Sequence, residues 1–310
     1  MKILLTADYH IKLSQKNIPE QWARDRYHLL FEQIYKIPVD IHVIAGDLFD
    51  RLPALKELEI YFDFIAGITT PTFIFDGNHC ATKKGCTFLG ALSKASKNIN
   101  PHVQIVVDVQ EELWGTILPY NKLKEKGLIE KLNKSKPLFT HVRGEIPPHV
   151  KPEIDLDRLK DFPLVFAGDL HSHSNTQRNI VYPGSPLTTS FHRSLVETGY
   201  IIIDSETLAW DWQAFEIPQL IRKTVTNEEE MVPTDYHHTV YELEGTVKDL
   251  SKVKNSDLLD KKIVKTESTA TLALSQEMSI EEELSTYLTN IMGLDSSTVS
   301  DIIGEFHDCI

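Results

Sequence analysis

Cysteine is scarce in this sequence. The 310 residues include only three, Cys80, Cys86 and Cys309. A small, odd number excludes the disulfide framework of a small secreted domain and favours a reducing compartment. A strand-like segment begins at Lys2, directly after Met1, so we expect no signal peptide. No apolar run approaches the ~18–20 residues that a helix needs to span a bilayer, so we expect no membrane segment and a cytoplasmic protein.

Positive charge is also in short supply. The chain has 32 Lys and Arg residues against 45 Asp and Glu residues, which gives a formal net charge of −13. Broad, sequence-blind binding of polyanions relies on Lys- and Arg-rich surfaces, so this mode of binding is excluded. If the chain acts on nucleic acid, the contact must come from a local patch, from metal ions or from a partner. The hydrophobic share of 41% provides for a substantial core, in one large domain or two modest ones.

Polar side chains follow three short apolar segments near the start of the chain. Segments 2–7, 41–44 and 71–76 are rich in β-branched, leucine or aromatic residues, which predicts buried parallel strands. The sequences that end or follow them are Asp8-Tyr9-His10, Gly46-Asp47-Leu48-Phe49-Asp50 and Gly77-Asn78-His79. Because α/β sheets bind ligands at the carboxyl ends of their strands, we expect these side chains to share one rim.

Two later segments end in the same way. Leu138-Phe139-Thr140 runs into His141, and residues 164–167 run into Gly168-Asp169-Leu170-His171. A histidine beside a glycine turn is commonly a loop residue, and an Asp after a strand is commonly a helix N-cap. Five such segments in order, each at a predicted strand end, favour one common site instead.

Carboxylate, amide and imidazole groups in this combination suit Mn²⁺, Fe²⁺ or Zn²⁺. The expected ligands of one ion are Asp8, His10 and Asp47. The expected ligands of the other ion are Asn78, His141 and again Asp47, whose carboxylate would bridge the two ions. Two ions ~3.5–4 Å apart would supply the nucleophile and the charge neutralisation that phosphodiester hydrolysis requires. The neighbouring His79 would protonate the departing oxygen, or else would only hold its loop through a hydrogen bond.

Two series of strands separated by helices predict an α/β fold over residues 1–217, a two-layer β-sandwich core with helices outside. Helices are expected at about 19–35, after Pro53, at 87–96 and at 121–132. A small α+β domain is expected at 218–270, with strands at 239–243 and 262–266 and a helix-like piece at 247–253. Residues 271–310 are expected to form a linker (267–278 is rich in Ser, Thr and Ala) and one or two amphipathic helices. The first helix would be capped by Ser279 and followed by an acidic turn.

The series of motifs resembles the calcineurin-like metallophosphoesterases over residues 1 to about 215. Within that superfamily, Gly46-Asp47-Leu48-Phe49-Asp50, the segment 182–186 and the small domain with a helical tail resemble the SbcD/Mre-type DNA repair nuclease subunits. The compact length is similar to that of the recombination endonuclease subunit of tailed phages. The resemblance implies a DNA exonuclease and endonuclease of recombination, repair and replication that uses two Mn²⁺ ions, with Mg²⁺ as the alternative.

The same resemblance implies partners. These are DNA and an SbcC/Rad-type ABC ATPase, with a homodimer of this chain inside a heterotetramer. The small domain would cap the nuclease domain, and the helical segment would dock on the base of the ATPase coiled coil. The apolar helix after Pro53 would be simply buried or would form part of the homodimer face. A phage source would place the protein in the host cytoplasm.

The chain departs from the family pattern at two points. The family usually has an acidic residue after Gly-Asn-His, and here that residue is Cys80. The last family motif is commonly Gly-His-x-His, and here it is Gly-Asp-Leu-His. Alignment on Gly168 makes Asp169 a ligand of the second ion and His171 a ligand of the first. The competing alignment uses the pair His171 and His173.

Other functions remain open at this point. A phosphatase or a cyclic-nucleotide phosphodiesterase would use the same scaffold, although neither needs the appended domain and tail. A catalytically degenerate assembly subunit is the third hypothesis, suggested by Cys80 and Asp169. Basic residues near the motifs would form a local rim for DNA or would be ordinary solvated side chains: Lys83, Lys84, Lys122, Lys124, Lys126 and Arg143.

Overall fold

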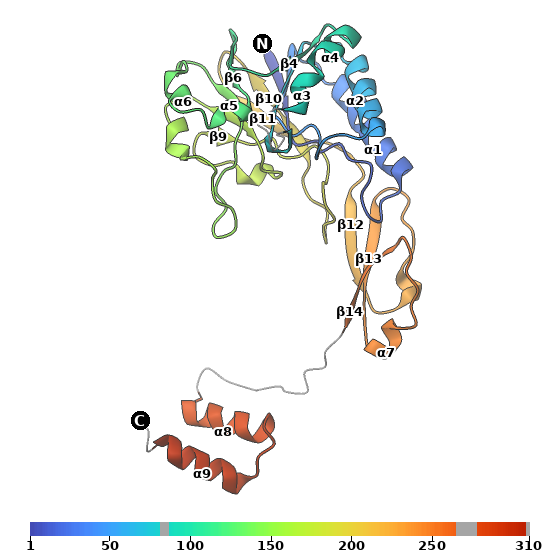
Figure 1. Ribbon diagram of the computed structural model, residues 1–310, viewed down its shortest axis with the longest axis vertical. Coiled ribbons are helices and arrows are strands. Elements are labelled where there is room, and N and C mark those ends of the chain that lie inside the picture. Colours follow the sequence, from blue (N-terminus) through green and yellow to red (C-terminus); the bar gives the residue numbers. More distant parts are fainter. Residues whose placement is uncertain (81–86, 265–277, 308–310) are drawn as a thin grey trace. The chain divides into compact units, whose positions relative to one another are not determined.

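The computed structural model describes residues 1–80, 87–264 and 278–307 of the chain (Figure 1). The chain forms two compact units. The first is Met1–Leu243 together with Lys254–Lys262, and the second is Glu244–Val253 together with Ile263–Ile310. Every candidate site residue named above belongs to the first unit.

A six-stranded mixed sheet in the order β11-β10-β1-β2-β3-β4 forms one layer of the first unit. Its parallel strands are β1 (Lys2–Thr6), β2 (Ile41–Ile44), β3 (Thr72–Phe75) and β4 (Val103–Val106). The hairpin of β10 (Gly199–Asp204) and β11 (Trp210–Ala214) extends it, with β10 antiparallel to β1. Thr6 pairs with Ile44, and Ile44 pairs with Ile74. Because these residues lie in one row, the segments after β1, β2 and β3 leave the sheet at the same edge.

A second sheet has five strands in the order β5-β6-β7-β8-β9. They are β5 (Gln110–Glu111), β6 (Thr116–Leu118), β7 (Leu138–His141), β8 (Val165–Gly168) and β9 (Ile180–Val181). Neighbouring strands are parallel except for β5 and β6. His141 pairs with Gly168, so the ends of β7 and β8 also lie together.

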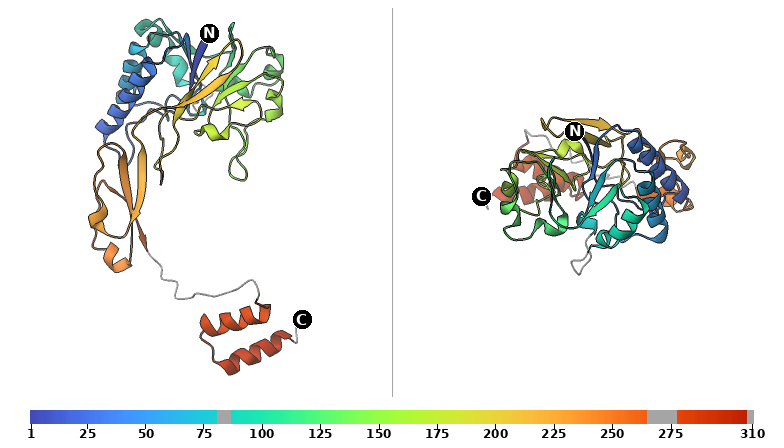
Figure 2. Two further views of the ribbon diagram at one scale, coloured as in Figure 1. Left: turned by 180° about the vertical axis from the view of Figure 1, so that it is seen from behind. Right: turned by 90° about the horizontal axis from the view of Figure 1, so that it is seen from above.

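The two sheets pack face to face, and helices cover their outer sides (Figure 2). In β1, Ile3 and Leu5 belong to the core between the sheets, together with Phe139 and Phe166 of the second sheet. Leu4 points the other way and packs with residues of α1 (Glu20–Tyr35) and α2 (Leu55–Gly67). This alternation follows from the two-residue period of a strand. The predicted two-layer sandwich with outer helices is confirmed.

Helix boundaries follow local signals in the sequence. Pro19 precedes α1, and the Glu57 side chain accepts the backbone N–H of Ala54 (2.8 Å) at the start of α2, so both predicted helices are confirmed. The helix expected at 87–96 is divided into α3 (Phe88–Ala91) and α4 (Ser93–Ile99).

The single helix predicted at 121–132 is wrong. The structure has two short helices there, α5 (Tyr120–Leu123) and α6 (Leu128–Lys131). Gly127 directly precedes α6 with a φ of 73°, a left-handed conformation that a continuous helix does not contain and that glycine adopts without strain.

A three-stranded sheet in the order β12-β13-β14 follows the sandwich. Its strands are β12 (Leu220–Val225), β13 (His238–Gly245) and β14 (Leu259–Val264), with β12 and β13 parallel, and the short helix α7 is Val247–Leu250. The strand expected at 239–243 is confirmed as part of β13. Of the strand expected at 262–266, residues 265 and 266 lie outside the described residues. The sequence analysis did not predict β12. The buried Glu242 joins the three strands, because its carboxylate contacts Arg193 (2.6 Å), Lys261 (2.8 Å) and Thr224 (3.2 Å).

The second unit contains two helices that pack on each other, α8 (Ile280–Asn290) and α9 (Ser296–His307). Ser279 caps α8 as predicted: its hydroxyl accepts the N–H of Glu282 (3.2 Å), whose carboxylate accepts the N–H of Ser279 (2.8 Å). The linker expected at 267–278 falls almost wholly on residues 265–277, outside the described part. No helix within residues 1–80, 87–264 and 278–307 has the length and apolar character needed to cross a membrane.

Candidate metal centre

The candidate ligands sit where the backbone turns sharply after each strand. Asp8, His10, Asp47 and Asp169 have φ values of 58°, 45°, 47° and 102°. Non-glycine residues rarely adopt positive φ, and such conformations persist only where the surrounding structure enforces them. Four of the seven predicted ligands therefore share a strained backbone, which is typical of a functional site.

Close packing of the backbone leaves no space for side chains at two glycines of the motifs. A Cβ added to Gly77 would lie 2.0 Å from Oδ1 of Asp47, and one added to Gly168 would lie 2.7 Å from Nδ1 of His141. Glycine at these positions allows the ends of β2, β3, β7 and β8 to approach one another. The motif glycines thus bring the two sheets' ligands together.

One group of ligand atoms lies where the strand ends of the six-stranded sheet meet those of the five-stranded sheet. Atoms of Asp8, His10 and His171 are all within 4.8 Å of one another. The Nε2 atoms of His10 and His171 face each other at 3.1 Å, and His10 Nε2 lies 3.7 Å from Oδ2 of Asp47. Helix α1 fixes this arrangement, because the hydroxyl of Tyr27 donates to the carbonyl of His10 (3.0 Å).

A second group shares Asp8 and Asp47 with His141, again within 4.8 Å. His141 Nε2 lies 3.5 Å from Oδ2 of Asp47 and 3.7 Å from Oδ1 of Asp169. The amide of Asn78 donates to the same Oδ1 at 3.1 Å. The structure therefore gathers all seven predicted ligands, with Asp47 between the two groups.

Three buried polar atoms of the candidate ligands have no hydrogen-bond partner among the described residues: Nδ1 of His10, Nε2 of His141 and Oδ1 of Asn78. His141 donates through Nδ1 to the carbonyl of Ala45 (2.9 Å), which directs Nε2 toward the carboxylates of Asp47 and Asp169. An unpartnered imidazole nitrogen beside carboxylates is the donor set that a divalent cation completes. The residues present therefore fit metal ions.

Without an ion, the titratable groups of this cluster shift one another's pKa values. Burial lowers the pKa of His141, but the nearby charges of Asp47, Asp8 and Asp169 outweigh it and raise that pKa to about 10. Burial raises the pKa of Asp8 to about 7, assisted by the Asp47 charge, whereas His141 and His10 hold the pKa of Asp47 at about 2 against the effect of its burial. In the absence of an ion, protons on His141 and Asp8 therefore offset part of the carboxylate charge that a bound cation would neutralise.

His79 lies beside this cluster in a fixed orientation. Its Nδ1–H donates to the carbonyl of Asp50 (2.6 Å), its backbone N–H donates to Oδ1 of Asp47 (2.9 Å), and its ring meets that of His10 edge-on at 4.7 Å. The Asp50 carboxylate contacts Lys12 (2.7 Å) and lies 3.5 Å from Nδ1 of His10. Sequence reasoning gave Asp50 no role, although the spacing Gly-Asp-x-x-Asp already placed it near the rim.

His173 is not part of the cluster. Its Nδ1 lies 2.7 Å from the carbonyl of Tyr182, and its ring stacks on Trp212 at 5.5 Å. This geometry favours the alignment on Gly168 over the alternative that uses His171 and His173.

The basic residues considered as a DNA rim have mixed placements. Lys83 and Lys84 lie outside the described residues. Lys122 pairs with Asp108 (3.4 Å) and Lys124 with Glu153 (3.3 Å), as expected for solvated lysines. Arg143 differs, because its guanidinium binds Asp169 within the metal centre.

A cavity of about 420 Å³ adjoins the metal centre. Residues around it include Leu170, His171, Asn175, Thr189, Ser190 and His192. The hydroxyl of Thr189 lies 3.1 Å from Nδ1 of His171, so the cavity and the metal centre share this histidine. Its lining is largely neutral and rich in hydroxyl groups.

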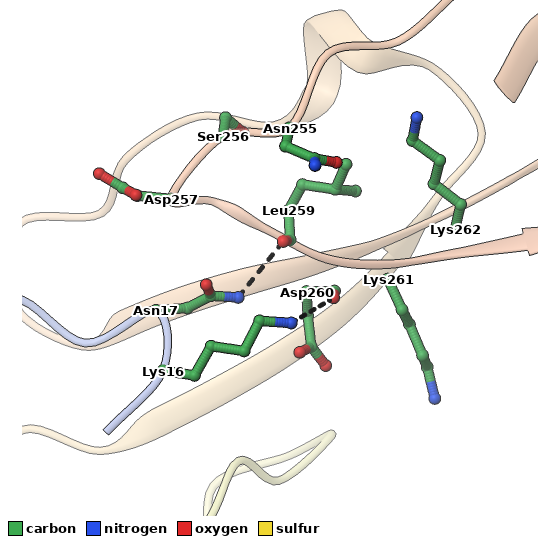
Figure 3. Close-up of a pocket in the computed structure, with 9 residues that line it drawn as sticks. All are labelled: Lys16, Asn17, Asn255, Ser256, Asp257, Leu259, Asp260, Lys261 and Lys262. Carbon is green, nitrogen blue, oxygen red and sulfur yellow. Dashed lines mark hydrogen bonds between the residues drawn. The ribbon is translucent and has the colours of Figure 1, made fainter. Parts of the chain in front are cut away.

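Another cavity, of about 350 Å³, lies between the loop after β1 and the segment that leads into β14 (Figure 3). Asn17 donates to the carbonyl of Leu259 and Lys16 to that of Asp260, both at 3.3 Å. The side chains of Lys261 and Lys262 extend in different directions (Figure 3). Because its charged groups do not converge, this cavity is not a candidate catalytic site.

Comparison with known proteins gives a family for the chain. Residues 1–172 match the model of the calcineurin-like phosphoesterases. A protein of Escherichia phage T5 named "Probable exonuclease subunit 1" is 42% identical over 282 residues, which cover 85% of this chain and 84% of that protein. A protein of Invertebrate iridescent virus 3, described as a phosphoesterase, is 26% identical and covers 74% of this chain and 70% of its own length. The solved structure of an archaeal phosphodiesterase covers 69% of this chain and all of its own, at 14% identity and a TM-score of 0.40.

Proposed function

The chain belongs to the calcineurin-like phosphoesterase family, and from this premise we propose that it is the nuclease subunit of a phage DNA-processing complex. One observation carries the proposal: the ends of strands from two sheets bring ligand atoms of Asp8, Asp47 and His141 within 4.8 Å of one another. The name of the T5 relative, an exonuclease subunit, supports a nucleic acid as the substrate and the presence of a further subunit. The reaction would be hydrolysis of DNA phosphodiester bonds, in exonuclease and endonuclease modes.

Two divalent ions would be bound at this centre, and Mn²⁺ fits its mixed oxygen and nitrogen ligands. The proposed ligands are Asp8, His10, Asp47 and His171 for the first ion, and Asp47, Asn78, His141 and Asp169 for the second. When bound, the ions supply an activated water and neutralise charge on the phosphoryl oxygens. Asp47 would be shared between them. Partial desolvation and the neighbouring His10 hold the pKa of His171 below its usual value, and a neutral imidazole is the form that binds a metal.

His79 would act as the general acid. Because its Nδ1–H donates to the carbonyl of Asp50, the transferable proton would be carried by Nε2. The backbone hydrogen bond from His79 to Asp47 ties the acid to the shared ligand, so both would keep a fixed relation to the reacting phosphorus. Protonation of the departing oxygen would avoid release of a strongly basic alkoxide.

The largely neutral cavity beside His171, which Glu197 also lines, supports a diester that places a nucleoside there over a small phosphomonoester. A nucleoside is uncharged, and hydroxyl and amide groups of the cavity would bind its sugar and base. That nucleoside would thereby be positioned without a broad basic surface, in agreement with the net charge of −13.

The remaining segments would serve the assembly. Residues 218–270 would form a cap for the nuclease domain 1–217, and residues 271–310 would dock on an SbcC/Rad-type ABC ATPase. Exposed apolar side chains on this last segment, Ile280 (71%) and Met292 (56%), support a partner surface. The complex would contain two copies of this chain and would act in the host cytoplasm.

The test uses the full-length chain after removal of metal by EDTA. With Mn²⁺ restored, we expect hydrolysis of linear DNA and of bis(p-nitrophenyl) phosphate, and loss of both activities in Asp47→Asn. Addition of the ATPase subunit with ATP should increase the rate on DNA but not on the small ester. Hydrolysis of p-nitrophenyl phosphate without any activity on the two diesters would contradict the proposal and favour a phosphatase.

A further inference from the structure

Arg143 holds the carboxylate of Asp169 with two hydrogen bonds. Its Nε donates to Oδ2 at 3.0 Å, and its Nη2 donates to Oδ1 at 3.1 Å. The Asp169 side chain is only 4% exposed, whereas that of Arg143 is 40% exposed. This planar, two-point geometry is the strongest form of carboxylate recognition by a side chain. The buried end of the pair lies in the metal centre, and its other end reaches solvent.

Arg143 donates hydrogen bonds to both carboxylate oxygen atoms of Asp169, and the second ion would need these atoms as ligands. Oδ1 of Asp169 also accepts from the amide of Asn78 (3.1 Å) and lies 3.7 Å from Nε2 of His141. A carboxylate has about four lone-pair positions, and three are directed at hydrogen-bond donors here. Coordination by Asp169 therefore requires Arg143 to share its acceptor atoms or to release them.

The backbone beside the guanidinium is anchored independently of Asp169. The N–H of Arg143 donates to Oε1 of Glu153 (3.1 Å), and the hydroxyl of Tyr120 donates to Oε2 of the same residue (2.6 Å). A guanidinium that releases Asp169 would remain at the edge of the metal centre, because its main chain stays fixed. Arg143 would then present a positive group where a phosphodiester anion approaches.

Given the proposed function, on which this inference rests, we propose that Arg143 is a positioning residue that acts as the internal counterion of Asp169 and competes with the second divalent ion for it. Before an ion arrives, the guanidinium holds the nearly buried carboxylate in place through its two hydrogen bonds. A buried carboxylate without such a partner is costly. By linkage, an ion that displaces Arg143 binds more weakly than it would to a free Asp169.

The test measures Mn²⁺ binding directly, by isothermal titration of the metal-free full-length chain. We expect Arg143→Gln to bind the second ion about fivefold more tightly than the wild type, the factor typical of a partly exposed ion pair. Arg143→Lys should fall between the two, because an ammonium competes as a point charge without the fork. The matched control is Arg178→Gln, whose 2.6 Å pair with Asp157 lies on the surface, and its Mn²⁺ binding should equal that of the wild type.

Thermal unfolding provides a second readout. Without Mn²⁺, Arg143→Gln should melt below the wild type, and saturating Mn²⁺ should raise its melting temperature by more than it raises that of the wild type. Unchanged or weaker Mn²⁺ binding in Arg143→Gln and Arg143→Lys would overturn the inference, because the pair would then only support the fold or orient a ligand. A wild-type chain that binds no Mn²⁺ would overturn the proposed function as well, so the two failures are distinguishable.

Discussion

Nε2 of His141 lies 3.5 Å from Oδ2 of Asp47, and both side chains are buried at the ends of strands from different sheets. The two residues approach because Gly46, Gly77 and Gly168 carry no side chains that would separate the strand ends. A divalent cation between this imidazole nitrogen and the carboxylate would bind both. The expectations for His141, His79 and Gly77 depend on this arrangement.

Replacement of His141 should remove one metal site. In His141→Asn, the shortened side chain no longer brings a donor atom to Asp47, so the Mn²⁺ stoichiometry by isothermal titration should fall from two to one. His173→Asn is the matched control, because His173 contacts Tyr182 and Trp212 instead of the cluster, and it should bind two ions. Two ions bound by His141→Asn would exclude this histidine as a ligand.

Replacement of His79 should slow proton transfer without loss of metal. We expect His79→Gln to bind two Mn²⁺ ions and to hydrolyse DNA about 10²- to 10⁴-fold more slowly. The loss should be much smaller for bis(p-nitrophenyl) phosphate, whose leaving group departs readily without a proton. Equal losses on both substrates would show that His79 acts on the loop and not as an acid.

A methyl group at Gly77 should damage the site directly. Its Cβ would lie 2.0 Å from Oδ1 of Asp47, so Gly77→Ala must displace the shared ligand. We expect loss of Mn²⁺ binding and a decrease of ~1–3 kcal/mol in the free energy of unfolding, measured by urea titration. Gly304→Ala in α9 is the control: nothing lies within 4 Å of its added Cβ, and greater helix propensity should slightly raise stability.

Glu242 should make the stability of the chain sensitive to acid. Its burial raises the pKa, but hydrogen bonds from Lys261, Arg193 and Thr224 outweigh burial and lower the pKa from 4.5 to about 2. A depressed carboxyl pKa stabilises the fold fully above about pH 4.5, and the contribution is lost as the pH falls toward 2. We expect Glu242→Gln to cost ~1–2 kcal/mol at pH 7 by urea unfolding, and the difference from the wild type to shrink below pH 4.5.

The control for this experiment is Glu206→Gln, whose side chain is 84% exposed. Its stability should follow that of the wild type at every pH. A Glu242→Gln variant with an unchanged difference between pH 7 and pH 3 would contradict the assigned pKa, even if its stability at pH 7 were reduced.

The sequence predicted the clustering of the candidate ligands better than it predicted the surrounding elements. Asp8, Asp47, Asn78, His141 and Asp169 each lie at or just after the end of a short apolar strand. Because parallel strands end at one edge, their convergence within each sheet follows from chain order, and the packing of the two sheets brings the two sets together. The sandwich is predictable for the same reason, because the alternation in β1 sends Ile3 and Leu5 to one face and Leu4 to the other.

Other features depend on contacts between distant residues. Strand β12 carries Arg222 and Lys223, which do not resemble a buried strand, and its pairing with β13 is supported by the buried Glu242. The pairing of Arg143 with Asp169 joins the ends of β7 and β8, so no local pattern reveals it. The division of the helix expected at 121–132 was foreseeable from Gly127, whose positive φ outweighs the helical character of the flanking lysines.

Anomalous diffraction from crystals grown with Mn²⁺ tests the central claim most directly. The account predicts two peaks ~3.5–4 Å apart on either side of Asp47, one near His10 and His171 and the other near His141 and Asn78. Absence of both peaks, or peaks bound elsewhere while Asp8, Asp47 and His141 remain together, would contradict it.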